Sequence, residues 1–327
     1  MTAPAAQVPR QSALAPAGPD AAIIDGLNWT MTIGSAVIFI AVLALVVRAM
    51  RPNRPVSARV WIVGGGLVLP LAILTALLAW SLASTAALSR PSSLTPLRVA
   101  VAAKMWWWEV RYTDPATGRD VVLANEIRLP VGRPVYLALT TSDVIHSFWV
   151  PALAGKVDMV PGRVHGLTLQ ADRAGTWRGQ CAEFCGIQHA KMALHVVAAP
   201  AAEFDAWLAG QARPAAGVSA EISATAAGAQ LARGRRAFLE RRCDACHAVR
   251  GVAEGGNEGA SATAGPDLTH VGSRLYLAAG TLPVHRGTLA GWIADPQSIK
   301  PGARMPAVRG LEGEELRARA AWLESLK

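Results

Sequence analysis

Residues 179–192 read GQCAEFCGIQHAKM and place two cysteines, a carboxylate, a histidine and a methionine in one loop-sized stretch. A second cysteine pair lies in CDACH, at residues 243–247, and these two motifs hold all 4 cysteines of the chain. Cysteine pairs form disulfides, zinc sites, thiol redox pairs or electron-transfer centres. The residues that accompany each pair decide among these.

The CDACH motif predicts covalently bound haem. In C-x-x-C-H both thiols can add to haem vinyl groups, and the histidine that follows can ligate the iron. A C-x-x-C pair alone is more often half of a zinc site or a redox pair. We therefore expect thioethers at Cys243 and Cys246, with His247 as the proximal ligand. Met305, in the PGARMPA loop well downstream of the motif, is the expected sixth ligand of the iron. A thioether in that place would raise the haem potential. The alternative is a methionine that only packs in its loop.

The residues around Cys181 and Cys185 predict copper. His189 and Met192 follow in the same loop, and thiolate, thioether and imidazole are soft ligands that select copper over hard cations. Two thiolates are one more than a mononuclear blue-copper site uses, so a pair of metal ions would employ both. His146, in TSDVIHSFWVP (141–151), is the candidate for the missing nitrogen ligand. A disulfide would leave the histidine and the methionine unexplained, and zinc rarely takes methionine.

Two apolar runs precede these motifs, from Leu27 to Met50 and from Val60 to about Leu82. Each is close to the roughly 20 residues that a helix needs to cross a bilayer. The chain is 52% hydrophobic, which is high for a soluble protein. We therefore expect a transmembrane helical hairpin. The Ala- and Pro-rich segment before Leu27 is predicted to be disordered and does not have the pattern of a cleavable signal peptide, so the first span is expected to be a retained anchor.

The formal net charge of +9 has its largest local excess between the two apolar runs. No acidic residue accompanies the arginines of that loop, which are Arg48, Arg51, Arg54 and Arg59. The positive-inside rule therefore puts the loop in the cytoplasm, and the N-terminus and everything after Leu82 outside. Residues 92–212 are nearly neutral, with 11 basic and 10 acidic residues. The charge pattern therefore indicates a membrane-flanking basic loop and excludes nucleic-acid binding.

The exported part divides into a β-rich and a helical region. Short runs of alternating apolar residues predict a sandwich or barrel, and they include VVLANEIRL (121–129), PVYLALTT (134–141), HGLTLQAD (165–172) and ALHVVAA (193–199). A short helix is expected at 202–211, then a linker rich in Ala, Ser, Gly and Pro, then mainly helical sequence. The expected divisions are an N-terminal tail (1–26), the hairpin (27–90), a β-domain (91–212), a linker (213–227) and a helical domain (228–327).

Two resemblances follow from these motifs. Residues 25–210 resemble subunit II of the haem–copper cytochrome c oxidases, through C-x-E-x-C-x3-H-x2-M, D-V-I-H-S-F and the aromatic stretch KMWWWEVRY (104–112). Residues 228–327 resemble a class I cytochrome c, through Gly234, Phe238, the GPDL loop (265–268) and a C-terminal helix with bulky apolar residues. The resemblances imply a multidomain membrane protein with a two-helix transmembrane hairpin, a cupredoxin-like β-barrel and an all-α cytochrome c domain.

The oxidase resemblance implies a dinuclear copper centre, CuA, bridged by both cysteines. It assigns His146 and Met192 to one copper, and His189 and the main-chain carbonyl of Glu183 to the other. The Glu183 side chain would reach a Mg²⁺ or Mn²⁺ ion at the boundary with the catalytic subunit. Trp106 falls where electrons enter from cytochrome c; buried packing is the alternative for it.

The cytochrome c resemblance implies that the Pro266 carbonyl lies against the ring of His247. Together the two resemblances imply that electrons pass from cytochrome c or another soluble donor to haem c, then to CuA, then to catalytic subunit I. That subunit would reduce O₂ to water and pump protons in the bacterial cytoplasmic membrane, with both redox domains on the periplasmic side.

Several alternatives stay open from the sequence. The catalytic partner could be of the nitric oxide reductase type, with a CuA-bearing second subunit. A free-standing electron carrier or copper chaperone fits the combined copper and haem motifs less well, and quinol-oxidising relatives lack the copper ligands. One departure from the oxidase pattern concerns proton entry. The glutamate that the family often has near the start of the second helix is missing, since no acidic residue lies between Asp25 and Glu109.

Overall fold

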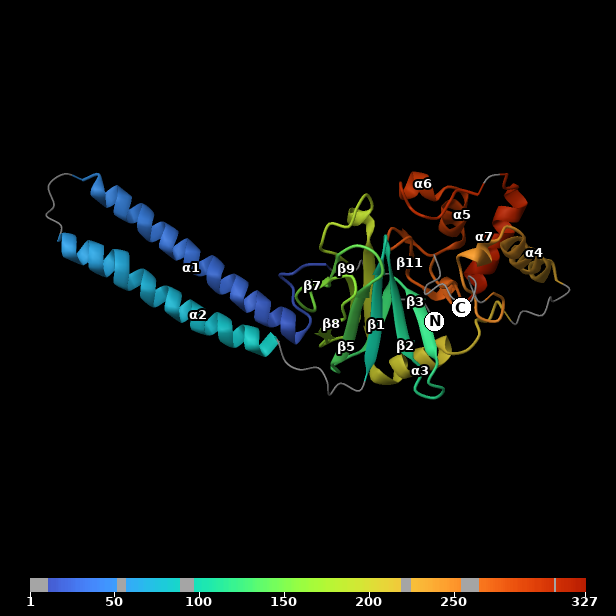
Figure 1. Cartoon of the computed structure of the whole chain (residues 1–327), viewed down its shortest axis with the longest axis horizontal. Helices are drawn as coiled ribbons and strands as arrows, with labels where there is room; N and C mark the ends of the chain where they lie inside the picture. The colour runs from blue at the N-terminus through green and yellow to red at the C-terminus, as the bar shows by residue number, and fades with distance from the viewer. Residues whose placement is uncertain (1–10, 52–56, 89–96, 219–224, 254–264, 309) are drawn as a thin grey trace.

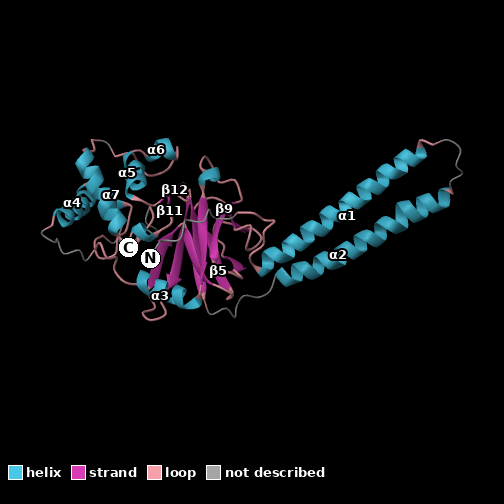
Figure 2. Cartoon of the chain, turned by 180° about the vertical axis from the view of Figure 1, so that it is seen from behind, coloured by secondary structure: helices cyan, strands magenta, loops and turns pink. Residues whose placement is uncertain are grey.

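The computed structural model describes residues 11–51, 57–88, 97–218, 225–253, 265–308 and 310–327. Arg54, the expected boundary at residue 90 and part of the expected linker lie outside these ranges. The N-terminal part is a pair of long helices, side by side, that extend away from the rest of the molecule (Figure 1, Figure 2). Helix α1 spans Pro19–Ala49, and α2 (Leu69–Leu88) continues a π-helical stretch, Val60–Val68. Helix α1 and the continuous run Val60–Leu88 are both long and apolar enough to cross a membrane.

Residues 11–18 pack on the β-domain and residues 19–26 form the first turns of α1, so the prediction of a disordered tail is wrong for residues 11–26. The main chain of Ala17 donates to the carbonyl of Ala152 (2.7 Å) and accepts from the amide of Asp172 (2.8 Å). Gly18 permits this close approach, because a Cβ there would lie 2.3 Å from a main-chain oxygen of the β-domain. Helix α1 therefore starts at Pro19 rather than at Leu27.

Two five-stranded sheets form the β-domain. The first has the spatial order β3-β2-β1-β5-β8, with bounds Asp120–Ala124, Trp107–Thr113, Arg98–Lys104, Val135–Thr141 and His165–Leu169. The second has the order β4-β10-β9-β6-β7, with bounds Glu126–Pro130, Ala193–Ala199, Gly175–Cys181, His146–Trp149 and Val157–Met159. Strand β1 pairs in parallel with β5, and β10 with β4, while the remaining neighbours are antiparallel. Helix α3 (Ala201–Gln211) follows β10.

The run at 121–129 does not form one strand but two, β3 and β4, in different sheets. The break is at Asn125, whose φ of 60° is in the left-handed region that asparagine tolerates better than most residues. The Asn125 side-chain oxygen accepts a hydrogen bond from the amide of Trp108 (2.9 Å). One residue thus turns the chain from one sheet to the other.

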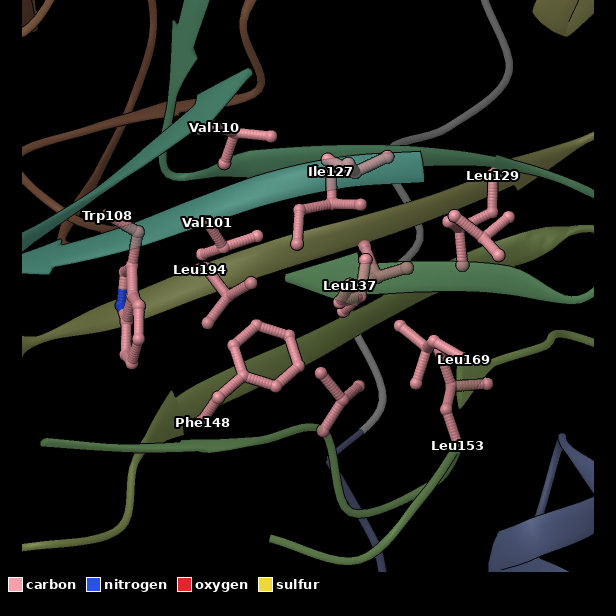
Figure 3. Packing of buried hydrophobic residues seen from close by; sticks show 14 of the residues in the cluster. Val101, Trp108, Val110, Ile127, Leu129, Leu137, Phe148, Leu153, Leu169 and Leu194 are labelled. Carbon is pink, nitrogen blue, oxygen red and sulfur yellow. The ribbon is translucent and has the colours of Figure 1, made fainter. Parts of the chain in front are cut away.

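The core lies between the two sheets (Figure 3). Figure 3 shows side chains of both sheets facing one another, among them Trp108, Phe148 and Leu194. The rings of Trp108 and Phe148 meet edge to face, with centroids 5.7 Å apart. Cys181 and Cys185 are buried members of the same cluster, so the packed sandwich supports the cysteine loop directly.

The C-terminal domain is mainly helical. Its elements are α4 (Ala226–Glu240), α5 (Arg286–Ala294), α6 (Pro296–Ile299), α7 (Gly313–Ser325), two single 3-10 turns (Cys243–Ala245 and Val271–Ser273) and the strand pair β11 (Tyr276–Leu277) and β12 (Leu282–Pro283). Helices α4 and α7 cross at Gly234, where a Cβ would lie 2.1 Å from the carbonyl oxygen of Ala318. The rings of Phe238 and Trp322 pack beside this crossing, with centroids 5.1 Å apart.

Candidate copper and haem sites

Neighbouring strands bring the candidate copper ligands together. His146 begins β6 and Cys181 ends β9, and these strands pair with Phe148 opposite Cys181. The loop after Cys181 closes on itself, because the amide of Cys181 donates to the carbonyl of Met192 (2.9 Å) just before β10 begins. The ligands from this loop and from β6 therefore meet at one end of the second sheet.

The sulfur and nitrogen atoms of these residues converge. The Sγ atoms of Cys181 and Cys185 lie 3.8 Å apart. The Nδ1 atom of His146 is 3.7 Å from Cys181 Sγ, and that of His189 is 3.6 Å from Cys185 Sγ. The Sδ atom of Met192 is 3.8 Å from Cys185 Sγ. Each thiol thus has one imidazole nitrogen beside it, in a set of soft ligands.

The cysteine pair is not a disulfide, since a disulfide needs sulfurs about 2.05 Å apart and both thiols are free. The carbonyl oxygen of Glu183 is 3.1 Å from Cys181 Sγ, so the main chain of Glu183 faces the pair. Its carboxylate accepts from the amide of Phe184 (3.2 Å). Within the described residues, one group of three or more His, Cys, Asp or Glu side chains could hold a metal ion. It consists of His146, Cys181 and Cys185. A second metal at Glu183 therefore stays a prediction.

Asp143 orients His146. Its carboxylate oxygen is 2.8 Å from His146 Nε2, which leaves Nδ1 as the nitrogen that faces the thiols. Burial by itself lowers the pKa of His146, but the hydrogen bonds to Asp143 and Cys181 outweigh it and raise that pKa above its usual value. Burial likewise raises the pKa of Asp143, and the hydrogen bond from His146 outweighs it, so the pKa of Asp143 is lowered. A carboxylate behind a ligand histidine fixes its tautomer and ring orientation.

The thiol of Cys181 is prepared to lose its proton. The hydrogen bond with the Cys185 thiol lowers the pKa of Cys181, and the contact with His146 lowers it further, against the effect of burial. Thiolates rather than thiols bind metals, so a low pKa at one sulfur favours metal loading.

Trp106 lies in the turn between β1 and β2 and contacts the cysteine loop. Its indole nitrogen donates to the carbonyl of Cys185 (2.8 Å). Gly186, with a φ of 111°, lies against the same indole, and a Cβ there would approach it to 3.1 Å. The tryptophan is therefore hydrogen-bonded to a candidate copper ligand, and its part in electron entry stays a prediction.

The C-x-x-C-H motif forms a turn directly after α4. The Nδ1 atom of His247 is 2.7 Å from the carbonyl of Pro266, an arrangement that leaves Nε2 with its lone pair free for iron. The amide of Gly265 donates to the carbonyl of Cys246 (3.0 Å), and a Cβ at Gly265 would lie only 2.6 Å from the His247 ring. Burial lowers the pKa of His247, so the ring is neutral at pH 7, as a metal ligand must be.

Met305 lies in the loop between α6 and α7. Its side chain packs against the same buried cluster as Cys243, and its carbonyl accepts from the side chain of Gln297 (2.9 Å). Gln297 also donates to the carbonyl of Ala303 (2.7 Å) and accepts from the amide of Gly302 (2.9 Å). One glutamine thus shapes the methionine loop.

Asp143 and Gln297 support the two candidate sites and were not predicted from the sequence. Asp143 stands three residues before His146 in the motif D-V-I-H-S-F, so its place in the motif was a usable signal. No sequence signal identified Gln297, because its partners are main-chain groups of a loop, and no sequence pattern specifies the path of that loop.

Two family models match separate parts of the chain. "Cytochrome C oxidase subunit II, periplasmic domain" matches residues 114–199, and "Cytochrome c" matches residues 231–327. These matches confirm the predicted combination of a cupredoxin-like domain with a C-terminal cytochrome c domain. Among solved structures, the periplasmic domain of subunit II of cytochrome oxidase (CoxB) of Bradyrhizobium japonicum is 29% identical, with a TM-score of 0.34. The similarity covers 36% of this chain and 94% of that one.

Curated relatives agree with the family models. Cytochrome c oxidase subunit 2 of Alkalihalophilus pseudofirmus is 38% identical over 230 residues, which cover 70% of this chain and 61% of the relative. The chain thus spans less than two thirds of that relative's length. Cytochrome c oxidase subunit 2 of Bacillus sp. (strain PS3) is 31% identical over 269 residues, which cover 80% of this chain and 71% of the relative. The chain therefore belongs to the cytochrome c oxidase subunit 2 family.

Proposed function

We propose that this chain is the electron-relay subunit of a bacterial haem–copper cytochrome c oxidase. It takes electrons from a soluble donor at a covalent haem c and passes them through a CuA centre to the catalytic subunit, which reduces O₂ and pumps protons. One observation carries the proposal: two buried thiols 3.8 Å apart, each beside an imidazole nitrogen, share a chain with C-x-x-C-H.

The residues present fit a dinuclear copper centre. Both thiols are unpaired, the thioether of Met192 lies beside Cys185, and Asp143 holds His146 with Nδ1 toward the sulfurs. When bound, the copper pair supplies a site that accepts and releases one electron. The chain's own contribution is to hold the ligands in place before and after that step. A buried, hydrogen-bonded ligand set moves little when its charge changes, so the reorganisation on electron transfer is small.

The residues of the C-terminal domain fit haem c. Cys243 and Cys246 would form the thioethers, and His247 would present Nε2 while Pro266 accepts the hydrogen of Nδ1. Gly265 leaves the room that the histidine ring needs on that side. Met305 would supply the thioether ligand that raises the haem potential.

The arrangement in the membrane is part of the same proposal. Helices α1 and α2 would span the bacterial cytoplasmic membrane, with the arginine-rich loop inside and both redox domains on the periplasmic side. Exposed apolar side chains cover both helices. They suit contact with lipid and with catalytic subunit I. Glu183, which follows Cys181 in the copper loop, would reach a Mg²⁺ or Mn²⁺ ion at the boundary with that subunit.

Two reciprocal variants test the redox assignments. Cys185→Ser is expected to abolish copper binding and the near-infrared CuA band while the haem spectrum is retained. Met305→Ala is expected to change the low-spin haem spectrum and lower the potential while copper is retained, so each variant is the control for the other. Two coppers and an unchanged band in Cys185→Ser would overturn the copper assignment, and an unaltered haem in Met305→Ala would exclude that ligand.

Co-purification identifies the terminal reaction. We expect the chain to purify with a large haem-bearing subunit, and the complex to consume O₂ when supplied with reduced cytochrome c. Consumption of nitric oxide in place of O₂ would instead assign the chain to a nitric oxide reductase-type complex.

A further inference from the structure

Residues 299–301 of the cytochrome c domain contact the copper loop (residues 181–192) and the turn between β1 and β2. The ammonium of Lys300 donates to the carbonyl of Trp106 (2.8 Å), and the residue is only 4% exposed. In the other direction, the copper loop donates twice to the carbonyls that flank Lys300. Lys191 Nζ binds the carbonyl of Ile299 (2.6 Å), and the Gln188 amide binds that of Pro301. Each domain therefore donates hydrogen bonds to the other: Lys300 to the turn between β1 and β2, and Lys191 and Gln188 of the copper loop to the carbonyls beside Lys300.

A second contact joins the same two domains about twenty residues earlier in the chain. The ring of Tyr276, in β11, stacks on His195 of β10, with centroids 4.1 Å apart and planes at 12°. Beside this stack, the amide of Leu275 donates to the buried carboxylate of Glu126 (2.9 Å). Because the contact at Lys300 and the stack at Tyr276 lie at different points, together they restrict rotation as well as separation of the domains.

The turn after β11 is shaped to the β-domain. Ala278, Ala279 and Gly280 all have positive φ values, of 52°, 54° and 78°. For alanine this conformation costs on the order of 1 kcal/mol per residue, and the surroundings must offset it. The carbonyl of Ala279 accepts a hydrogen bond from the amide of Ala193 (3.1 Å), and the Ala279 side chain is buried in one cluster with Trp107 and Ala124 of the β-domain. Contacts with the β-domain thus offset the unfavourable backbone conformation of this turn.

Close ion pairs do not hold this interface, although Glu126 attracts the buried guanidinium of Arg274 at longer range. Throughout the described residues, every ion pair within 4.0 Å joins two groups of the same domain. Burial lowers the pKa of Lys300 to about 7, and an amine donates a hydrogen bond in either protonation state. Soluble redox partners instead meet through small interfaces with charge steering, which salt weakens.

We propose that the cytochrome c domain is permanently docked on the β-domain through the docking face, defined as Trp106, Trp107, Glu126, Gln188, Lys191 and His195. Lys300 is the positioning residue that keeps the methionine loop in register with the copper loop. The link is short, because Lys300 precedes Met305 by five residues, and Trp106, which it contacts, donates to the carbonyl of Cys185. The proposal rests on the copper and haem assignments made above, and it concerns how the two sites are held together.

Two measurements on the purified oxidase complex test the proposal. Hydrogen exchange reports docking directly, because the amides of Leu275 and Ala193 bond across the interface. Rapid-mixing spectroscopy reports the rate at which reduced haem c passes its electron to copper. Raising the ionic strength from about 0.1 M to about 1 M shortens the Debye length from about 10 Å to about 3 Å. Both amides are expected to stay protected, and the haem-to-copper rate to stay unchanged, over that range.

Lys300→Met is expected to slow haem-to-copper transfer several-fold, because it removes the contact that fixes the methionine loop beside Trp106 and lets the separation of the two sites increase. The midpoint potentials and spectra of both centres should not change, and Lys300→Arg, which keeps a donor, should recover most of the rate. Arg304→Gln, an exposed change in the same loop, is the matched control and should leave the rate as it is. Tyr276→Ala, which leaves the Lys300 contact in place, is expected to expose the Leu275 amide.

A rate that falls several-fold with salt, or interface amides that exchange as fast as those of an open linker, would overturn permanent docking. An unaltered rate in Lys300→Met would overturn the role of Lys300. Failure of the underlying assignments is distinguishable, because it removes the near-infrared copper band or the covalent haem spectrum from the unsubstituted protein.

Discussion

At the scale of single residues, the copper site depends on groups behind the ligands as much as on the ligands. Asp143 holds His146 by one carboxylate oxygen, and its other oxygen accepts from the amide of Met105 (2.7 Å). The candidate ligands were predictable because five of the six lie within residues 181–192, where the spacing of the cysteines, His189 and Met192 indicates copper and the family resemblance adds the carbonyl of Glu183. The connection from Asp143 to Met105 was not, because it joins a strand end to a turn 38 residues away in the chain.

Asp143→Ala is expected to weaken copper binding by about 10- to 100-fold, because loss of the carboxylate that accepts from His146 Nε2 frees that histidine to rotate and change tautomer. Copper affinity measured by competition titration tests this. Asp143→Asn should lose less, since its amide oxygen can still accept from His146. Asp158→Ala removes a half-exposed carboxylate of the nearby β7 and is the control. Equal affinities in Asp143→Ala and the control would contradict the role of Asp143.

At the scale of elements, the cytochrome c domain depends on the crossing of α4 and α7. Gly234 was identified from its position in the family pattern, and the structure supplies the reason: the carbonyl of Ala318 and the Cβ of Trp322 leave no room for a side chain. Strand division was less predictable. The run at 121–129 reads as one strand, and only the backbone conformation of Asn125 separates it into two sheets.

Gly234→Ala is expected to destabilise the cytochrome c domain by about 1–3 kcal/mol, because the added methyl meets main-chain atoms that must move. Gly291→Ala in α5 is the matched control. A Cβ there has open space, so the better helix propensity of alanine should stabilise the domain by about 0.5–1 kcal/mol. Thermal unfolding of the intact chain, followed by haem absorbance, separates the two, and an unchanged midpoint in Gly234→Ala would contradict the crossing.

The contact between His195 of β10 and Tyr276 of β11 is expected to weaken in acid. Burial and the nearby Arg178 lower the pKa of His195 to about 4, although Glu126 faces it from β4 and Tyr276 stacks on it. The neutral His195 ring therefore contributes fully to the stability of the folded state above the unfolded pKa of about 6.5. This contribution is lost as the pH falls toward about 4. At pH 5 the loss is about 2 kcal/mol. His195→Phe keeps a ring for Tyr276 and should abolish this part of the pH dependence of unfolding; an unchanged dependence would contradict the assignment.

At the scale of the whole molecule, one chain carries an apolar helical hairpin, a cupredoxin-like domain and a cytochrome c domain. The order of these parts was predictable from apolar runs and ligand motifs, which are local in the sequence. Their relative placement was not, because contacts such as Lys300 to the Trp106 carbonyl join residues 194 positions apart and use main-chain atoms that leave no sequence pattern. The N-terminal segment is a similar case, since its partners are backbone groups of the β-domain.

The most direct test of electron relay follows the haem of the intact oxidase after rapid mixing with a reduced donor in the presence of oxygen. In the unsubstituted complex we expect haem c to become reduced and then to be reoxidised as electrons pass to copper. In Cys185→Ser the haem should be reduced at the same rate and remain reduced, because the next site is missing. Reoxidation of haem c at the unsubstituted rate in a copper-free Cys185→Ser complex would contradict the relay.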